Sequence, residues 1–253
     1  MMRFDRILLA DLLKIRRTPL LWIHLFLPLL AAGGLVGYAA ISSLDTLSIT
    51  VAFMELLGVA LPLVIGVLTA MLAEQEATAG GFQNLLTTST PKLLAFLSKL
   101  CLLLLMGFVS IMLAVGGFGT GLKVLLHREG PTWDFYVISA CVLAGSCIIL
   151  YIVHLMISLC FGQGASIGLG ITGSLLTALL LTGLGDGIWP LMPHSWPIRL
   201  PIIWVLYSGN QPMSDFLFTQ LRSVIWIGTV ATAGLLLLSC VWFTRWEGRK
   251  SEA

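Results

Sequence analysis

The stretch "LLAFLSKLCLLLLMGFVSIMLAVGGFG", residues 93–119, decides the fold class of this chain, and Lys99 is its only charged residue. An α-helix rises about 1.5 Å per residue, so a run of this length crosses the ~30 Å hydrocarbon core of a bilayer. The stretch therefore predicts a membrane-spanning helix.

The composition extends this interpretation to the whole chain. Of its 253 residues 58% are hydrophobic and 10% are charged, whereas soluble domains carry about 25% charged residues. The apolar–polar alternation of membrane β-strands is missing. The five cysteines fall inside apolar runs, without the spacing of a disulfide framework or a zinc site. We predict an all-α integral membrane protein that forms one domain over residues 1–253.

Six apolar runs are long enough to span a bilayer as helices. They cover residues 20–40, 50–73, 93–119, 135–160, 165–185 and 223–244.

The distribution of lysine and arginine predicts the orientation, because basic residues accumulate on the cytoplasmic side. If the N-terminus is cytoplasmic, the inner segments hold ten basic residues: Arg3, Arg6, Lys14, Arg16, Arg17, Lys92, Lys99, Arg245, Arg249 and Lys250. The outer segments then hold four: Lys123, Arg128, Arg199 and Arg222. This asymmetry predicts that both termini are cytoplasmic.

Residues 1–19 form a separate element before the first span. On a helical wheel Phe4, Leu8, Leu12 and Ile15 share one side. The basic residues on the other side are Arg3, Arg6, Lys14 and Arg17. This pattern predicts an amphipathic helix in the membrane interface, with its basic side toward the headgroups. The alternative is a basic flank that only sets the topology.

The predicted outer segment 186–222 is unusually apolar and is interrupted by five prolines. It contains Trp189, Trp196 and Trp204. Non-helical backbone at membrane depth needs protein or water partners. We predict a partly re-entrant pair of short helices with tryptophan at the interface, and the alternative is a plain loop on the headgroups.

Signatures of catalysis and of nucleotide binding are missing from the sequence. There is no G-x-x-x-x-G-K-[ST] phosphate loop, no H-E-x-x-H and no G-x-S-x-G. The chain is therefore not expected to act as an enzyme by itself, to bind a metal or to bind nucleic acid. His154 is interpreted as a packing residue. Glu55 is the clearest charge inside a span, and it either lines a polar site or lies at the interface.

One polar segment, "EQEATAGGFQNLLTTSTPK" at residues 74–92, separates the second and third spans on the predicted cytoplasmic side. Thr90 and Pro91 suit an N-cap and a first-turn proline, so the segment has a defined end. The other inner connection, residues 161–164, is very short. We expect only the first of the two to present a sizeable surface.

The order of elements resembles the permease subunits of type-2 ABC exporters. The residue pattern of "EQEATAGGFQNLLTTSTPKLLAFLSK", residues 74–99, is similar to that of the family's first inner loop. In both, acidic residues are followed by glycine, a short apolar helix, proline and a basic residue. Within the family, the chain length and the residue pattern of the loop are most similar to those of the lantibiotic (bacteriocin) immunity permeases. The resemblance implies a multi-pass protein of the bacterial cytoplasmic membrane.

The resemblance also implies that this loop is a coupling helix, which docks on a separate ATPase subunit present in two copies. ATP and Mg would bind to that subunit, and this chain would bind no cofactor. The implied coupling residues are Glu74, Glu76, Gly80, Gly81, Phe82, Leu85 and Leu86, with Thr90, Pro91 and Lys99 marking the loop end. Carboxylates would meet basic residues of the partner, and the apolar side chains would enter a groove. The alternative is a polar connecting loop with no partner.

The implied cargo is a lantibiotic or similar antimicrobial peptide, collected from the bilayer and expelled outward, with a related or identical second permease. Candidate residues along the cargo path are Glu55, Asp186, Trp189, Trp196, Trp204 and Asp215. The alternatives are another cargo (a drug, a lipid-linked glycan or an ion) and a membrane signalling or assembly subunit that moves no cargo. An intramembrane enzyme would need a polar catalytic cluster, which the sequence does not show.

Overall fold

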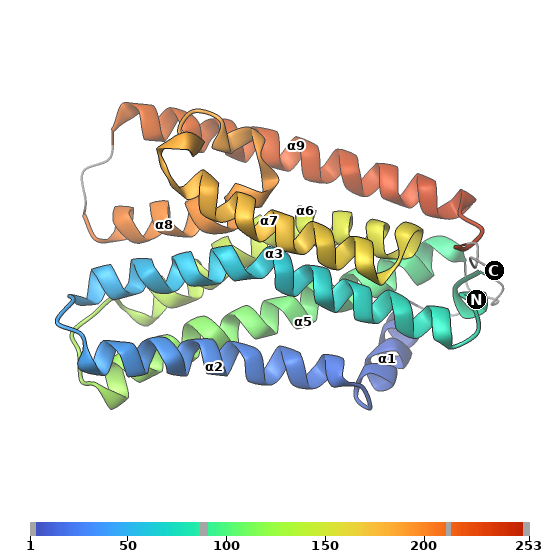
Figure 1. The fold of residues 1–253 in the computed structure, drawn as a ribbon, viewed down its shortest axis with the longest axis horizontal. Helices are drawn as coiled ribbons and strands as arrows, with labels where there is room; N and C mark the ends of the chain where they lie inside the picture. The colour runs from blue at the N-terminus through green and yellow to red at the C-terminus, as the bar shows by residue number, and fades with distance from the viewer. Residues whose placement is uncertain (1–3, 87–90, 211–213, 250–253) are drawn as a thin grey trace.

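The computed structural model describes residues 4–86, 91–210 and 214–249, which form an elongated bundle of α-helices (Figure 1). The helices are α1 (Phe4–Ile15), α2 (Pro19–Ile41), α3 (Thr46–Thr78), α4 (Gln83–Leu86), α5 (Lys92–Thr120), α6 (Trp133–Phe161), α7 (Gln163–Leu181), α8 (Trp196–Ser208) and α9 (Asp215–Arg245). The shorter elements are a π-helical turn, η1 (Gly121–Leu125), and three 3₁₀ turns, η2 (Gly183–Gly185), η3 (Trp189–Leu191) and η4 (Pro193–Ser195). These ranges contain no strand, and the all-α class is confirmed.

Six helices of the described ranges, α2, α3, α5, α6, α7 and α9, are long and apolar enough to cross a membrane. The six predicted spans are thus confirmed, and most of their limits agree with the helices to within four residues, but two differ by five or more. Helix α3 continues through Glu74 and Glu76 to Thr78. Helix α9 starts at Asp215 rather than at residue 223. Its first turns include Gln220, which is buried and which the predicted limits placed in the outer segment 186–222.

Both α1 and the last turn of α9 lie at one end of the bundle, which we call the terminal end (Figure 1). Successive spans run in opposite directions along the bundle. The α3–α5 connection and the α6–α7 turn therefore also lie at the terminal end. The connections α2–α3, α5–α6 and α8–α9 lie at the opposite end.

The core consists of two apolar clusters. One includes Phe96, Leu155 and Phe243 toward the terminal end. The other includes Phe53 and Phe118, whose rings are stacked with centroids 4.1 Å apart. Side chains from α2, α3, α5 and α6 interdigitate in the second cluster, so these helices form the rigid frame of the molecule.

The second half of the chain covers α3 in two pieces, α7 and then α8, both antiparallel to it. Ser166 of α7 donates to the Gly66 carbonyl of α3 at 3.0 Å. The Ile198 backbone of α8 lies so close to Gly58 that a Cβ at Gly58 would come within 2.6 Å of it. Gly58 lies about 18 Å along α3 from its start at Thr46, at 1.5 Å per residue. The segment before α8 therefore enters the bundle deeply, as the re-entrant interpretation predicts, and does not rest on its end.

The prediction that the tryptophans of this segment lie at the membrane interface was wrong for two of the three. Trp189 is 0% exposed and Trp196 is 3% exposed. The Trp189 indole donates to Gln220 Oε1 at 2.8 Å, and the Trp196 indole donates to the Pro190 carbonyl at 3.2 Å. Both indoles find their hydrogen-bond partners inside the protein, so they need no headgroup or water. They anchor the re-entrant segment to α9 and to itself.

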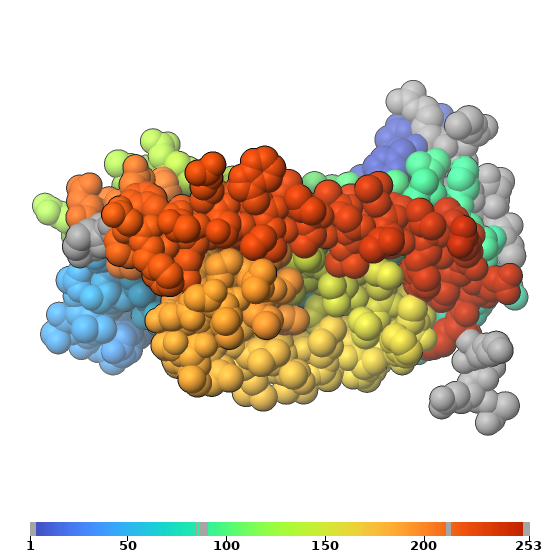
Figure 2. Space-filling view, turned by 90° about the horizontal axis from the view of Figure 1, so that it is seen from above, coloured from blue at the N-terminus to red at the C-terminus, as the bar shows by residue number. Residues whose placement is uncertain are grey.

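Helix α9 lies on the outside of the bundle along its length (Figure 2). Only 11% of its most apolar window is buried, and Trp226, Val230 and Leu237 are each at least 65% exposed. In a bilayer this face meets lipid or another chain. Its terminal-end residues, in contrast, close over the α3–α5 connection.

Candidate functional site

The connection from α3 to α5 turns sharply through three successive residues with positive φ. These are Gly80 (φ 126°), Gly81 (φ 59°) and Phe82 (φ 68°). The amide of Gly81 donates to the Ala77 carbonyl at 2.7 Å and that of Phe82 to the Glu76 carbonyl at 3.1 Å, which closes the end of α3. Glycine adopts such angles without steric penalty, whereas a bulky residue such as Phe82 is held there by its surroundings. The predicted tight turn is therefore present, and it is strained at its last residue.

Phe82 and Leu85 point into the protein, which corrects the expectation that they enter a partner's groove. They are 3% and 4% exposed. The Phe82 ring meets the Trp246 ring edge-on, with centroids 5.1 Å apart. Leu85 lines a small cavity together with Phe96 and Phe243. Leu86 is partly buried on the same cluster. The apolar side chains of the loop thus pack against the rest of the same chain. The exposed side of the loop consists of Thr78–Gly81 with Gln83.

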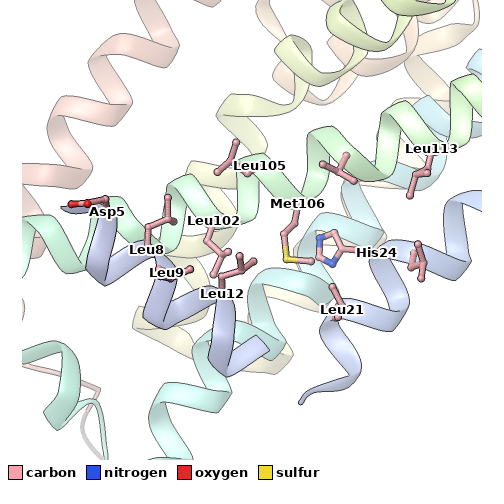
Figure 3. Close-up of a pocket in the computed structure, with 12 residues that line it drawn as sticks. Asp5, Leu8, Leu9, Leu12, Leu21, His24, Leu102, Leu105, Met106 and Leu113 are labelled. Carbon is pink, nitrogen blue, oxygen red and sulfur yellow. The ribbon is translucent and has the colours of Figure 1, made fainter. Parts of the chain in front are cut away.

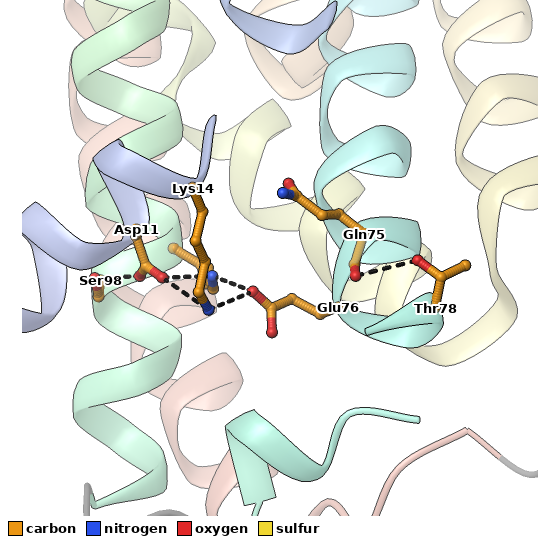
Figure 4. A network of polar contacts seen from close by, with 7 residues as sticks. Asp11, Lys14, Gln75, Glu76, Thr78 and Ser98 are labelled. Atoms are coloured by element: carbon orange, nitrogen blue, oxygen red, sulfur yellow. Dashed lines mark hydrogen bonds and ion pairs between the residues drawn. The ribbon is translucent and has the colours of Figure 1, made fainter. Parts of the chain in front are cut away.

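Glu76 belongs to a buried network of charges that joins α1, α3 and α5 (Figure 4). Lys99 Nζ lies 2.6 Å from Asp11 Oδ1 and 2.5 Å from Glu76 Oε1. Ser98 donates to the other oxygen of Asp11 at 2.7 Å. Lys14 Nζ lies 3.4 Å from Glu76 Oε1 and 3.8 Å from Asp11 Oδ1. The side chains of Asp11, Glu76 and Lys99 are at most 7% exposed.

This network contains two carboxylates and two ammonium groups, so its formal charge is zero. Charges in an apolar interior persist only where they are paired. Two expectations are corrected here: Glu76 cannot reach a basic residue of a partner, and Lys14 is directed to Glu76 and Asp11 rather than to headgroups alone. The network fixes α1 and the start of the α3–α5 connection to α5, and movement of the loop would be transmitted to both helices.

The two ends of the connection are held by the C-terminal residues that follow α9. Arg249 Nη2 lies 3.3 Å from Glu74 Oε2, and its guanidinium lies over the Phe82 ring at 5.7 Å. Lys92 donates to the Trp246 carbonyl at 3.0 Å. Glu74, at 38% exposure, is thus half-accessible but already paired. Pro91 directly precedes α5 instead of lying in its first turn, and Thr90 lies outside the described residues.

The stripe that helix α1 buries shares only Ile15 with the predicted apolar side. Ile7, Asp11 and Ile15 face the protein, whereas Leu9, Leu12 and Leu13 are 45–57% exposed. The carboxylate of Asp11 is neutralised by Lys99 from another helix, which a helical wheel of α1 alone cannot reveal. Among the predicted basic residues Arg6 and Arg17 are exposed, and Arg3 lies outside the described residues.

An apolar groove of about 490 Å³ opens between α1, α2 and α5 (Figure 3). Its lining consists of Asp5, Leu8, Leu9, Leu12, Leu21, His24, Leu25, Leu102, Leu105, Met106, Val109 and Leu113. Asp5 lies at one end of the row of side chains and Leu113 at the other. The groove is open at the surface of the bundle. The sequence pattern did not predict it, because three separate helices form it.

The predicted cargo-path residues do not converge on one site. Asp186 is 61% exposed and pairs with Arg199 at 3.0 Å, and Asp215 is exposed at the start of α9. Trp204 packs on Phe135 with centroids 6.2 Å apart. Glu55 is partly buried in α3. With Trp189 and Trp196 in the core, the set is dispersed over the half of the bundle away from the terminal end.

His154 has the packing role that the sequence suggested. It is fully buried, and its Nδ1 lies 3.1 Å from Ser166 Oγ between α6 and α7. No group of three or more metal-ligating side chains is found within the described ranges. The residues that sequence reasoning missed are Asp11, Trp246 and Arg249, and only their distant partners in the fold identify them.

Gly80 offers a direct test of the turn. A Cβ at Gly80 would meet no atom within 4 Å, so its backbone angle alone opposes substitution. We expect Gly80→Ala to strain the turn by about 1–3 kcal/mol and to lower the thermal unfolding midpoint of the purified protein. Gly116→Ala is the matched control, because its Cβ also meets nothing and its φ is helical. Equal unfolding midpoints of the two variants would show that the positive φ of Gly80 does not matter for stability.

Comparison with known proteins identifies the family to which the chain belongs. No curated protein matches the chain. The model of the family described as "ABC-2 family transporter protein" matches residues 7–178, which include α1, the charge network on α3 and α5, and most of α7. This match covers more than half of the 253 residues, and the chain therefore belongs to the ABC-2 family of transporter proteins, as a multi-pass membrane permease subunit of an ABC transporter.

Proposed function

We propose that this permease, driven by a separate ATPase subunit, expels a lantibiotic or a similar cationic antimicrobial peptide from the bacterial membrane to the outside. Both termini and the α3–α5 loop then lie in the cytoplasm. A related or identical second permease completes the complex. The ATPase carries the nucleotide chemistry, since the sequence of this chain has no phosphate-binding loop.

The groove between α1, α2 and α5 is the observation that supports an amphiphilic cargo. It is lined almost wholly by apolar side chains and is open at the surface of the bundle. Its volume of about 490 Å³ falls within the usual range of ligand pockets, about 300–1,000 Å³. A peptide inserted in the membrane could place apolar side chains there without leaving the bilayer. An ion or a glycan headgroup would find few polar partners in this lining.

The charge network supports the ATP-driven part of the proposal. It ties the end of α3 to α1 and α5, two of the three helices that form the groove. Force applied to the loop by an ATPase would therefore change the groove. A rigid, electrically neutral junction transmits such displacement better than a flexible linker, because packed interiors have low compressibility.

Growth inhibition tests the cargo. A sensitive bacterium that expresses the complete complex is expected to tolerate a several-fold higher concentration of a cationic lanthionine peptide, with no change for an uncharged lipid-linked glycan inhibitor. Leu105→Trp, which fills the groove, should remove this protection. Leu175→Trp is the matched control, because Leu175 is 69% exposed on α7 and lies outside the groove. Protection that is unaffected by Leu105→Trp would exclude the groove, and protection only against other compounds would exclude the peptide.

A further inference from the structure

The turn between α6 and α7 lies against the C-terminal segment at the terminal end, although its length predicted that it would present little surface. Helix α6 ends at Phe161 and α7 begins at Gln163, so Gly162 alone connects them. Gly162 has φ 87°. A Cβ at this residue would lie 2.5 Å from Nη1 of Arg249. The guanidinium of Arg249 therefore packs directly on the backbone of the turn.

The same guanidinium contacts the α3–α5 loop, through Glu74 and the Phe82 ring. Arg249 thus lies between the two connections at the terminal end, which are separated by about 80 residues of sequence (residues 82 and 162). Its side chain is 28% exposed. Its Nη2 pairs with the Glu74 side chain while its Nη1 lies against Gly162, so one planar guanidinium contacts both connections.

Both connections leave an uncharged face toward the surrounding solution. On the loop, Thr78–Gly81 and Gln83 are exposed. On the turn, Gln163–Ala165 are exposed, and Phe161 is 70% exposed. Glu74 and Arg249, which lie beside this face, are paired with each other. Within the described ranges, the face common to the two connections therefore offers small residues, amides and one aromatic ring.

We propose that the ATPase subunit docks on both connections together, with Arg249 as the positioning residue that holds them in register. This inference rests on the proposed function, because it assumes that an ATPase docks at this end. The matching surface of the ATPase has uncharged polar groups and a pocket for Phe161, in place of the basic patch that the sequence suggested. Docking of this kind depends little on ionic strength, because few exposed charges are screened.

Photo-cross-linking in the assembled complex tests the composite surface. The photoreactive residue p-benzoylphenylalanine is placed at Ala79 on the loop, at Ala165 on the turn and at Ala40 as a control. All three alanines are exposed, and Ala40 lies near the opposite end of α2. We expect cross-links to the ATPase from Ala79 and Ala165 and none from Ala40. Cross-links from Ala79 without Ala165 would overturn this inference alone, whereas none from either would overturn the proposed function as well.

Charge exchange tests the positioning role of Arg249. We expect Arg249→Glu to lower the cross-linking yield from Ala165 several-fold relative to the yield from Ala79. The double variant Glu74→Arg with Arg249→Glu should restore it, because the ion pair is re-formed with reversed polarity. Unfolding would lower both yields together and would not be rescued, so the ratio separates positioning from stability. A ratio unchanged by Arg249→Glu, or a loss that the exchange does not repair, would contradict the role of this residue.

Discussion

Lys99→Met is expected to lower the free energy of unfolding by about 3–5 kcal/mol, because it leaves buried carboxylates without their principal cation. Lys99 Nζ is the closest cationic group to both Asp11 and Glu76. Methionine fits the volume of the lysine stem, so the lost charge dominates the effect. In the detergent-solubilised complex, the variant should show a markedly lower thermal unfolding midpoint than the unmodified protein.

Lys14→Met is the matched control for this experiment. Lys14 also lies within 4 Å of Asp11 and Glu76, but its side chain is 46% exposed. Solvent screening limits such a pair to about 0–1 kcal/mol. The triple variant Asp11→Asn, Glu76→Gln and Lys99→Met should recover much of the loss, because no unpaired charge remains. If Lys99→Met and Lys14→Met unfold at the same temperature, the buried network does not stabilise the fold.

Trp189→Ala is expected to cost about 3–5 kcal/mol, the usual cost of removing a fully buried aromatic ring. The ring belongs to the same apolar cluster as Phe96 and Phe243, and its indole N–H donates to Gln220 of α9. Trp189→Phe keeps most of the apolar contact and should cost less, chiefly the hydrogen bond, about 1 kcal/mol. Thermal unfolding of the purified protein measures both.

Trp226→Ala provides the comparison, because Trp226 is 67% exposed on the outer face of α9. It should leave the unfolding midpoint nearly unchanged. The experiment also decides between two roles for Trp189. A Trp189→Ala variant with normal stability but lost peptide resistance would support the original cargo-path assignment, and would contradict the anchoring role that its burial indicates.

Several features of the candidate site could be predicted from local sequence. Gly80 and Gly81 form the tight turn that adjacent glycines suggest, and Pro91 marks the start of α5. The end of α3 was harder to predict from the sequence, because the low hydropathy of Glu74 and Glu76 is typical of loop residues. Glu76 remains helical and buried since Lys99 neutralises it. Hydropathy alone does not include pairing between distant charges.

The direction in which the loop side chains point could not be predicted from the sequence either. Phe82, Leu85 and Leu86 form the kind of apolar group that binds a partner, and nothing nearby in the chain competes for them. In the structure the competitor is Trp246, which follows the last span. Likewise the alternation of prolines and tryptophans in residues 186–222 predicted a re-entrant path, but the depth of Trp189 required Gln220 of α9 as a partner.

The sequence by itself determined the class of the molecule: long uncharged apolar runs must satisfy their backbone hydrogen bonds internally in a bilayer, so they form spanning helices. Local turn chemistry likewise determined where the polar connection bends. Tertiary structure alone decided which charges are available to a partner. Asp11, Glu76, Lys99 and Arg249 are far apart in the chain, and only the packing of α1, α3, α5 and α9 pairs them. Because a charge is stable in an apolar interior only beside its counter-ion, that packing removes Asp11, Glu76 and Lys99 from the surface of the terminal end.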